Sequence, residues 1–249
     1  MLLRSAPREL LQTARSDKVA NPEILLKTKR VIACVKPAGL VSEDAERDSL
    51  PRLLSEILQE SGEKSEIYTV HRLDKTVGGV IVFARDSGTA AVLTSQIAER
   101  EFQKCYLAVL DGVPKEREGR LVDLLYHDKA KNKTYAVRRE RRGVKKAILE
   151  YRVIGVSKNE EKSLVLVKLI TGRTHQIRAQ FSSRKLPLSG DRRYGSAERD
   201  CDIALWSASV DFKSDGKTHN ITKIPPDSYP WRLFGDTEFY EKILEGGFQ

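Results

Sequence analysis

Two apolar runs, at residues 80–84 and 164–170, constrain the possible folds of this chain most strongly. The first is uninterrupted and follows the pair Gly78-Gly79, and both have the composition of strands that are buried on both faces. Such strands need covering elements on each side of a sheet. The two runs therefore predict a central sheet with other elements packed against it.

The rest of the pattern supplies further strands and several helices. Further strands are predicted at residues 24–26, 31–35, 67–70 and 149–153. Two helices are predicted with Ser49 and Ser87 as their N-caps, and a third is predicted to begin at Thr174. Strands outnumber helices and do not alternate with them strictly. The predicted fold class is therefore α+β, with a mixed, largely antiparallel sheet and flanking helices.

The composition is basic, with 44 Lys and Arg against 35 Asp and Glu and a formal net charge of +9. A hydrophobic content of 40% is sufficient for a core in a chain of 249 residues. We expect residues 1–20 to form an arm and residues 21–249 to form one catalytic domain. The charge suits a polyanionic partner, although charge that only keeps a protein dispersed explains the composition equally well.

Cysteine, histidine and hydropathy patterns argue against several classes of protein. Cys34, Cys105 and Cys201 are odd in number and embedded in apolar stretches, which predicts buried thiols in a reducing compartment. The four histidines lack the spacing of a zinc site, so we expect no metal. The sequence has neither a run of eighteen apolar residues nor a signal-peptide core. It therefore predicts a cytoplasmic protein that does not bind membranes.

The densest group of chemically active residues occupies positions 71–79, with the sequence HRLDKTVGG. It places the Asp74 carboxylate between cations and beside two glycines, which can bring backbone close to a ligand. Taken alone, the group is better explained as a charged turn between two strands.

A second group, residues 171–178, joins a buried strand to the beginning of a helix and has the sequence TGRTHQIR. Helix N-termini favour anions, and arginine favours carboxylate or phosphate. A capped helix with arginines facing solvent is the ordinary explanation of this stretch alone. The presence of both groups indicates a site.

The stretch HRLDKTVGGVIVFAR, residues 71–85, resembles the catalytic motif of RluA-type pseudouridine synthases, a His-Arg-Leu-Asp box before a small-residue turn and a strand. Four further stretches agree with this family in order and spacing: KPAGL at 36–40, KCYLA at 104–108, TGRTHQIR at 171–178 and GDRRYG at 190–195. With five motifs in register, the chain is identified as a member of the family by resemblance.

The resemblance implies three catalytic residues. Asp74 corresponds to the nucleophile and Arg178 to the arginine paired with it. Tyr106 would stack on the extruded base and help to move its proton. Because burial of an unpaired carboxylate raises its pKa, an adjacent arginine keeps such a group ionised.

The same motifs imply residues that contact RNA. Arg72 would enter the RNA helix where the target uridine leaves it, and Leu73 and Ile177 would line the pocket. Three more residues of these motifs are predicted to bind RNA: His71, Lys104 and Arg173.

The implied reaction breaks the bond between sugar and nitrogen, turns the base and rejoins it through carbon. A carboxylate can hold one fragment by adding to the base or to the sugar, and both routes stay open. The uridine has to be flipped out of its helix first. The expected partner is structured ribosomal or transfer RNA, the expected state is a monomer, and no cofactor or other small molecule is required.

The chain departs from the commonest family pattern at Val77-Gly78-Gly79, where Thr-Ser-Gly is usual. This puts hydrogen bonds near the site in doubt, but not the reaction. We also expect no separate RNA-binding domain before the catalytic domain, so that target choice would rest on the catalytic domain.

Two other functions stay open at this point. One is a non-catalytic RNA-binding or ribosome-assembly factor of the same fold, and the other is a hydrolase that uses Asp74 with His71 or His175. Residues 128–146 hold nine Lys or Arg. Phosphate binding and a solvated hairpin explain this stretch equally well.

Overall fold

The computed structural model describes residues 21–43, 49–159 and 161–248. The predicted arm at residues 1–20 lies outside the described residues. The helices are α1 (Leu50–Glu60), α2 (Ser87–Glu99), α3 (Gln176–Ser182) and α4 (Thr237–Gly246), and two short 3-10 helices cover Arg192–Tyr194 and Trp231–Leu233. The strands are β1 (Ile24–Lys27), β2 (Val31–Lys36), β3 (Tyr68–Thr69), β4 (Gly78–Ala84), β5 (Gln103–Asp111), β6 (Glu118–Asp128), β7 (Lys133–Val137), β8 (Val144–Val156), β9 (Lys162–Leu169), β10 (Leu205–Ser214) and β11 (Lys217–Thr222).

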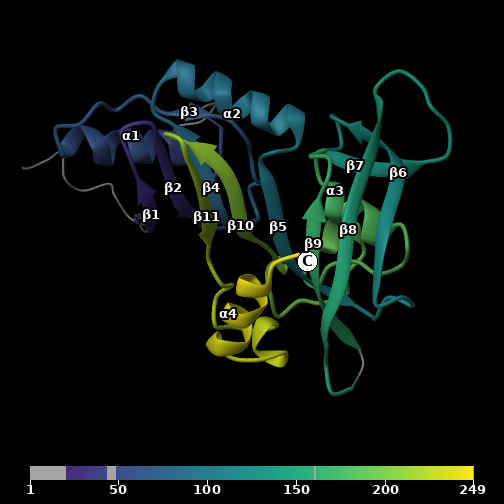
Figure 1. Ribbon diagram of the computed structural model, residues 1–249. Helices are drawn as coiled ribbons and strands as arrows, with labels where there is room; N and C mark the ends of the chain where they lie inside the picture. The colour runs from purple at the N-terminus through teal and green to yellow at the C-terminus, as the bar shows by residue number, and fades with distance from the viewer. Residues whose placement is uncertain (1–20, 44–48, 160, 249) are drawn as a thin grey trace, which may run out of the picture.

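These strands form one sheet with the order β1-β2-β4-β10-β5-β9-β8-β6-β7, with β3 beside β4 and β11 beside β10 (Figure 1). Strands β4 and β10 pair in parallel, and the other pairings among the described strands are antiparallel. The predicted α+β fold, with a mixed, largely antiparallel sheet and flanking helices, is confirmed.

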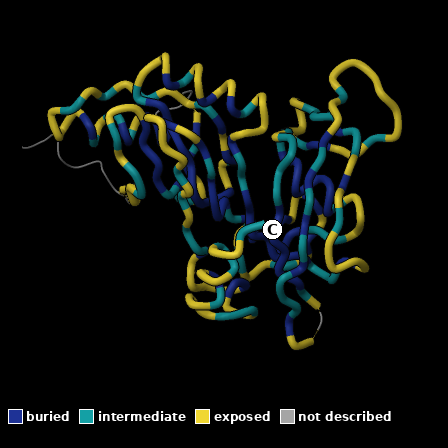
Figure 2. Tube along the Cα trace, in the orientation of Figure 1, coloured by how far each residue is buried: buried dark blue, intermediate teal, exposed yellow. Residues whose placement is uncertain are grey.

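Helices cover both faces of the sheet, which explains the continuous apolar runs. Every residue of β4 is buried, with Ile81 facing the cluster that includes α1 and Val82 facing the cluster that includes α2. Helices α3 and α4 cover opposite faces of β5 and β9 in the same way. Figure 2 shows the buried residues concentrated in the strands. Both predicted buried strands are confirmed, although the burial of the second ends at Val167.

Gly78 and Gly79 allow β10 to approach β4 closely. Gly79 has a φ of 115°, and a Cβ atom there would lie 2.3 Å from the backbone oxygen of Ser207. A Cβ atom on Gly78 would lie 2.6 Å from the ring of Trp206. The expectation that these glycines bring backbone close to a ligand is therefore replaced by a role in strand packing.

Two helices begin at other residues than predicted. Helix α2 is capped by Asp86, whose carboxylate accepts a backbone N–H of the first turn at 2.8 Å, and Ser87 is already helical. Helix α3 begins at Gln176, after His175 in the left-handed conformation with a φ of 53°. Thr174 therefore lies in the preceding loop. The left-handed residue redirects the chain between β9 and α3.

Cys34 and Cys105 are buried free thiols, as predicted, whereas Cys201 is a free thiol that is partly exposed and not buried as predicted. Burial raises the pKa of the Cys34 thiol to about 12 and that of the Cys105 thiol to about 11. Both buried thiols are therefore protonated and unreactive at neutral pH.

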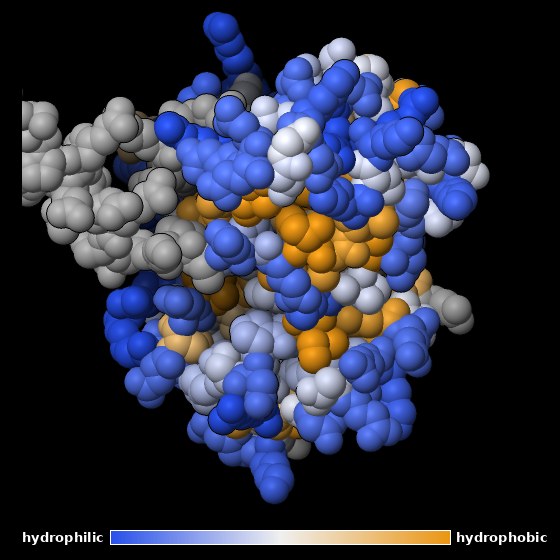
Figure 3. Space-filling view, turned by 90° about the vertical axis from the view of Figure 1, so that its left-hand side faces the viewer, coloured by the Kyte–Doolittle hydropathy of each residue, from blue (hydrophilic) through white to orange (hydrophobic). Residues whose placement is uncertain are grey.

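The left-hand side of the molecule in Figure 1 carries patches of apolar side chains within a mainly hydrophilic surface (Figure 3). The exposed large apolar residues among those described are Ile24, Tyr68, Val92, Val122, Tyr135, Tyr229 and Leu233. They are scattered over different elements. The predicted monomeric state stays a prediction.

No helix in the described ranges is long and apolar enough to cross a membrane.

Candidate active site

Asp74 lies on the turn between β3 and β4. The backbone N–H of Val77 donates to the Asp74 carbonyl at 2.9 Å and closes this turn. Buried Ser42 braces the preceding residue, because its Oγ donates to the Leu73 carbonyl at 2.9 Å and accepts the Leu73 N–H at 3.1 Å. The backbone that carries Asp74 is therefore held from both sides.

Lys36 at the end of β2 supports the same loop from inside the protein. Its Nζ is fully buried and donates to the carbonyls of Pro37, Leu40 and Lys75 at 3.0, 2.8 and 3.1 Å. Burial lowers the pKa of Lys36 to about 8, and the nearby carboxylate of Asp74 opposes this shift. The KPAGL stretch thus contributes an ammonium group that uses all three of its donors.

Arg178 from α3 joins Asp74 to a second carboxylate. Its Nη1 donates to Asp74 Oδ2 at 3.0 Å, while Nε and Nη2 donate to the two oxygens of Asp191 at 2.7 and 2.9 Å. Burial alone would lower the pKa of Arg178, but Asp191 and Asp74 outweigh it and raise that pKa above its ordinary value. The predicted partnership of Arg178 with Asp74 agrees with this geometry.

His175 and Tyr194 complete the surroundings of the Asp74 carboxylate. His175 Nε2 lies 3.7 Å from Asp74 Oδ2, and its Nδ1 lies 3.0 Å from the Tyr194 hydroxyl. The Tyr194 ring also packs under the Arg178 guanidinium, with 4.9 Å from Cζ to the ring centroid. Tyr194 therefore contacts both groups that face Asp74.

A cavity of about 630 Å³ opens beside Asp74, at the centre of the sheet. It is lined by Leu73, Tyr106 and Ile177, as predicted for the pocket, and by Lys104. Burial and, to a smaller extent, the charge of Asp74 raise the pKa of the Tyr106 hydroxyl above its ordinary value. Tyr106 is therefore a protonated phenol at neutral pH.

Lys104 is the lysine that lines this cavity. Burial lowers the pKa of its amine, which forms no ion pair with any described residue. A cation in such surroundings favours an anionic ligand.

The His71 side chain makes its contacts inside the protein and not at the surface. It is buried, its Nε2 accepts the Val82 N–H of β4 at 3.1 Å, and its ring packs on Phe102 at 5.1 Å. Burial, with the charge of Lys104 second, lowers the pKa of His71 well below its ordinary value. This neutral imidazole braces β4, which favours a structural role over the RNA contact predicted for it.

Arg72 and Arg173 lie at the surface around the cavity mouth. The Arg72 guanidinium donates to Glu43 and to Thr174 Oγ1 at 2.9 and 2.8 Å, and its side chain is 55% exposed. Arg173 Nε donates to the Lys146 carbonyl at 3.0 Å. Both arginines remain accessible to a ligand at the rim.

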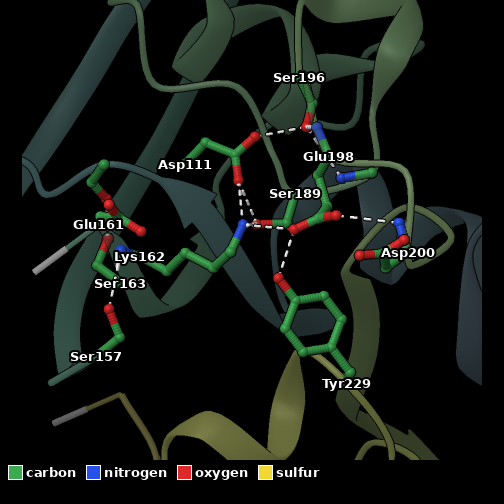
Figure 4. Close-up of polar contacts among 12 residues, drawn as sticks. Asp111, Ser157, Glu161, Lys162, Ser163, Ser189, Ser196, Glu198, Asp200 and Tyr229 are labelled. Atoms are coloured by element: carbon green, nitrogen blue, oxygen red, sulfur yellow. Dashed lines mark hydrogen bonds and ion pairs between the residues drawn. The ribbon is translucent and has the colours of Figure 1, made fainter. Parts of the chain in front are cut away.

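A polar network anchors the loop that carries Asp191 (Figure 4). Lys162 at the start of β9 donates to Asp111 at 2.8 Å and to Ser189 at 3.2 Å, and it lies 3.1 Å from Glu198. Burial would lower the pKa of Lys162, but Asp111 and Glu198 raise it above its ordinary value. The ends of β5 and β9 thereby hold residues 189–198 against the sheet.

Four of the five sequence motifs fall within the region matched by a family model, and GDRRYG at 190–195 lies beyond it. Residues 30–183 match the model described as RNA pseudouridylate synthase. The chain belongs to the RNA pseudouridylate synthase family. The matched residues include Asp74, Tyr106 and Arg178, so these members of the candidate site fall within the family region.

Curated members of the family are about a third identical to this chain over the aligned residues. The RNA pseudouridine synthase YhcT of Bacillus subtilis is 31% identical over 71% of this chain and 59% of its own length. The ribosomal large subunit pseudouridine synthase D of Zymomonas mobilis is 32% identical over 71% of this chain and 57% of its own length. The chain thus spans less than two thirds of these relatives.

Solved structures of pseudouridylate synthase domains share the fold. Human RNA Pseudouridylate Synthase Domain Containing 1 matches with a TM-score of 0.73 at 19% identity, over 93% of this chain and 98% of that one. Human RNA Pseudouridylate Synthase Domain Containing 4 matches with a TM-score of 0.67 at 23% identity, over 82% and 89%. The predicted synthase fold is confirmed.

Three residues of the site had no predicted catalytic role: Asp191, Tyr194 and His175. Asp191 and Tyr194 belong to the GDRRYG stretch, for which no role was predicted, and a role for His175 was considered only in the hydrolase alternative. Among the described residues, no cluster of three or more His, Cys, Asp or Glu side chains could hold a metal ion. The expectation that no metal or cofactor is needed stays a prediction.

Proposed function

We propose that this chain isomerises uridine to pseudouridine in structured RNA. The observation that carries the proposal is the pairing of Asp74 with Arg178 at 3.0 Å, beside a 630 Å³ cavity lined by Tyr106. A carboxylate that accepts a charge-assisted hydrogen bond from a buried guanidinium is held in a fixed position, and a carboxylate can act as a nucleophile.

Asp74 forms a bond to the uridine through a carboxylate oxygen, at the base or at the sugar, and the bond between sugar and nitrogen breaks. The released base turns within the cavity and reforms its link to the sugar through carbon 5. If Asp74 has added to the sugar, its carboxylate leaves as carbon 5 bonds to the sugar; if it has added to the base, its carboxylate leaves after that bond has formed. In both cases the carbon-5 proton is released to solvent and the Asp74 carboxylate is restored. Tyr106 stacks on the base and assists that proton transfer. Leu73 and Ile177 exclude water from the cavity.

RNA binding in this proposal uses the cations around the cavity mouth. Arg72 is the exposed residue that fills the gap left by the flipped uridine, at a cost of a few kcal/mol in unstacking. Lys104 and Arg173 bind phosphates at the rim. Phosphate binding by residues 128–146 stays one of two open explanations; Arg193 donates to the Lys131 carbonyl at 2.9 Å and so holds this stretch beside the GDRRYG stretch.

Ribosomal RNA is the favoured substrate class, because several relatives are named for the ribosomal large subunit. Transfer RNA is the other outcome of the test. The cytoplasmic location stays a prediction.

The test is tritium release from carbon-5-labelled uridine in ribosomal and transfer RNA incubated with the protein. Release from ribosomal RNA alone is expected. Release from neither RNA, while both are bound, would replace the synthase with the RNA-binding factor.

A further inference from the structure

We propose that His175 is a positioning residue for the Asp74 nucleophile, acting as a neutral imidazole whose tautomer is set by Tyr194. This inference rests on the proposed function of Asp74. It assigns a role to the left-handed residue before α3 and to the tyrosine of the GDRRYG stretch.

The geometry places His175 between a hydroxyl and a carboxylate. Its buried ring has Nδ1 at 3.0 Å from the Tyr194 hydroxyl and Nε2 at 3.7 Å from Asp74 Oδ2. The φ of 53° at His175 turns the chain sharply before α3 and gives the ring this position. A left-handed residue that is not glycine is uncommon, which fits a site that depends on this particular side chain.

The Tyr194 hydroxyl determines which nitrogen carries the proton. Its oxygen already accepts the backbone N–H of Thr134 at 2.7 Å. In this proposal the Tyr194 hydrogen is therefore donated to His175 Nδ1, 3.0 Å away. Nδ1 is then an acceptor, and the ring proton resides on Nε2. This proton faces Asp74, whereas the other tautomer would turn a lone pair toward the carboxylate.

The groups around His175 keep it neutral. Burial lowers its pKa to about 4, with Arg178 and His127 acting in the same direction and Asp74 and Asp191 opposing them. His127 contacts the ring edge-on, with 5.9 Å between centroids. A neutral N–H orients the carboxylate without competing with Arg178 for its charge.

Both donors face the same oxygen of the nucleophile. Arg178 Nη1 and His175 Nε2 point at Oδ2, while Oδ1 accepts no hydrogen bond from the part of the chain that the structure describes. Oδ1 is therefore the oxygen left to attack the uridine. The 3.7 Å separation is longer than a hydrogen bond, and contacts of this kind commonly shorten when substrate fills the site.

The same contacts connect the nucleophile to the basic stretch. Thr134 lies in β7, and its Oγ1 donates to the Thr174 carbonyl at 2.8 Å, next to His175. RNA bound along residues 128–146 would thus stabilise the arrangement that sets the tautomer.

The first test replaces the N–H donor without straining the backbone. Asparagine tolerates the left-handed conformation, and in His175→Asn its short amide can still accept from Tyr194 but does not reach Asp74. We expect the single-turnover rate to fall about tenfold while the Kd for RNA stays within about twofold. An unchanged rate would overturn the proposal.

The second test separates positioning from simple packing. Tyr194→Phe keeps the ring under Arg178 but removes the hydroxyl, so it should also slow turnover about tenfold. When Tyr194→Phe is combined with His175→Asn, the turnover rate should fall no further than in His175→Asn alone, because no imidazole tautomer remains to be set. Multiplying losses in the double variant would contradict the proposal.

The third test does not need activity. Nitrogen-15 spectra of histidine-labelled native protein should show His175 protonated at Nε2 alone at pH 7, and a mixture of tautomers in Tyr194→Phe. A proton on Nδ1 in the native protein would overturn the inference even if the enzyme is active. Absence of tritium release with the native protein would instead refute the proposed function and leave the tautomer measurement valid.

Discussion

Asp191 holds the Arg178 guanidinium through two hydrogen bonds, from Nε at 2.7 Å and from Nη2 at 2.9 Å. Both side chains are at most 5% exposed. This leaves Nη1 for Asp74, the more exposed of the two carboxylates. One guanidinium therefore binds both the buried Asp191 carboxylate and the carboxylate of the proposed nucleophile, and Asp191 sets its direction.

Replacing Arg178 by lysine removes this double contact. A single ammonium cannot bind Asp191 through two bonds and also reach Asp74, so we expect Arg178→Lys to slow turnover about ten- to a hundredfold. Single-turnover tritium release measures the effect. The control is Arg184→Lys, which alters a more exposed pair with Asp123 and should leave the rate within about twofold. Equal rates for both variants would contradict the assignment of Arg178.

Asp191→Asn should lower both the stability of the protein and its turnover rate. Loss of the buried carboxylate leaves the Arg178 charge poorly compensated, with an expected loss of about 3 kcal/mol in the free energy of unfolding. Urea unfolding gives this number. Asp123→Asn, at the partly exposed pair with Arg184, should lose only about 1 kcal/mol or less. If Asp191→Asn also lost only about 1 kcal/mol or less in the free energy of unfolding, the pair of Asp191 with Arg178 would contribute little to stability.

Gly79→Ala should disrupt the joint between β4 and β10. The new Cβ atom would collide with the Ser207 backbone oxygen at 2.3 Å, so β4 and β10 would have to separate. We therefore expect the free energy of unfolding to fall by about 3 kcal/mol or more, as measured by urea unfolding. Gly216→Ala is the matched control, because Gly216 also has a positive φ but nothing lies near its Cβ position. It should cost about 1 to 2 kcal/mol from the backbone alone. If Gly79→Ala and Gly216→Ala lost similar amounts of unfolding free energy, a collision between residue 79 and the Ser207 backbone would be ruled out.

The protein should lose stability as the pH falls from about 6.5 to about 4. The pKa of His175 is lowered to about 4 from an ordinary value of 6.5, and that of His71 is lowered well below 6.5. Above pH 6.5 these histidines are neutral in both states and have no effect. Below it the unfolded chain gains protons that the folded protein does not, which favours unfolding by roughly 2 to 3 kcal/mol for His175.

Urea unfolding at pH 7.5 and pH 4.5 tests this dependence. His175→Asn should show a smaller loss between the two pH values than the native protein, because one of the two histidines is gone. An equal loss in both proteins would show that His175 is not held neutral by the fold.

The buried strands β4 and β9 were predictable because each contains a run of consecutive apolar residues, whereas β5, β6, β7, β10 and β11 were not predicted. Residues 80–84 and 164–167 are apolar on both sides because helices cover both faces of the sheet. The pairing of Gly79 with Ser207 was not predictable, since no local pattern identifies a partner so far along the chain. The beginnings of α2 and α3 were each missed by one or two residues, because Asp86 and Ser87 are both capping residues and a left-handed histidine has no sequence signature.

The candidate site was only partly predictable. The motif resemblance supplied Asp74, Tyr106 and Arg178, which lie around one cavity. Asp191 was missed because its charge looks like that of any surface aspartate until the fold places it against Arg178. The burial of His71 also could not be seen, since it depends on β4 and Phe102 packing around the ring.

The central claim is that Asp74 is the nucleophile that converts uridine to pseudouridine. The most direct measurement is single-turnover tritium release from carbon-5-labelled ribosomal RNA by the native protein and by Asp74→Asn, which keeps the size of the side chain and can still accept from Arg178. We predict release by the native protein and none above background by the variant, with equal RNA binding by both. Release by Asp74→Asn at a rate near that of the native protein would contradict the account.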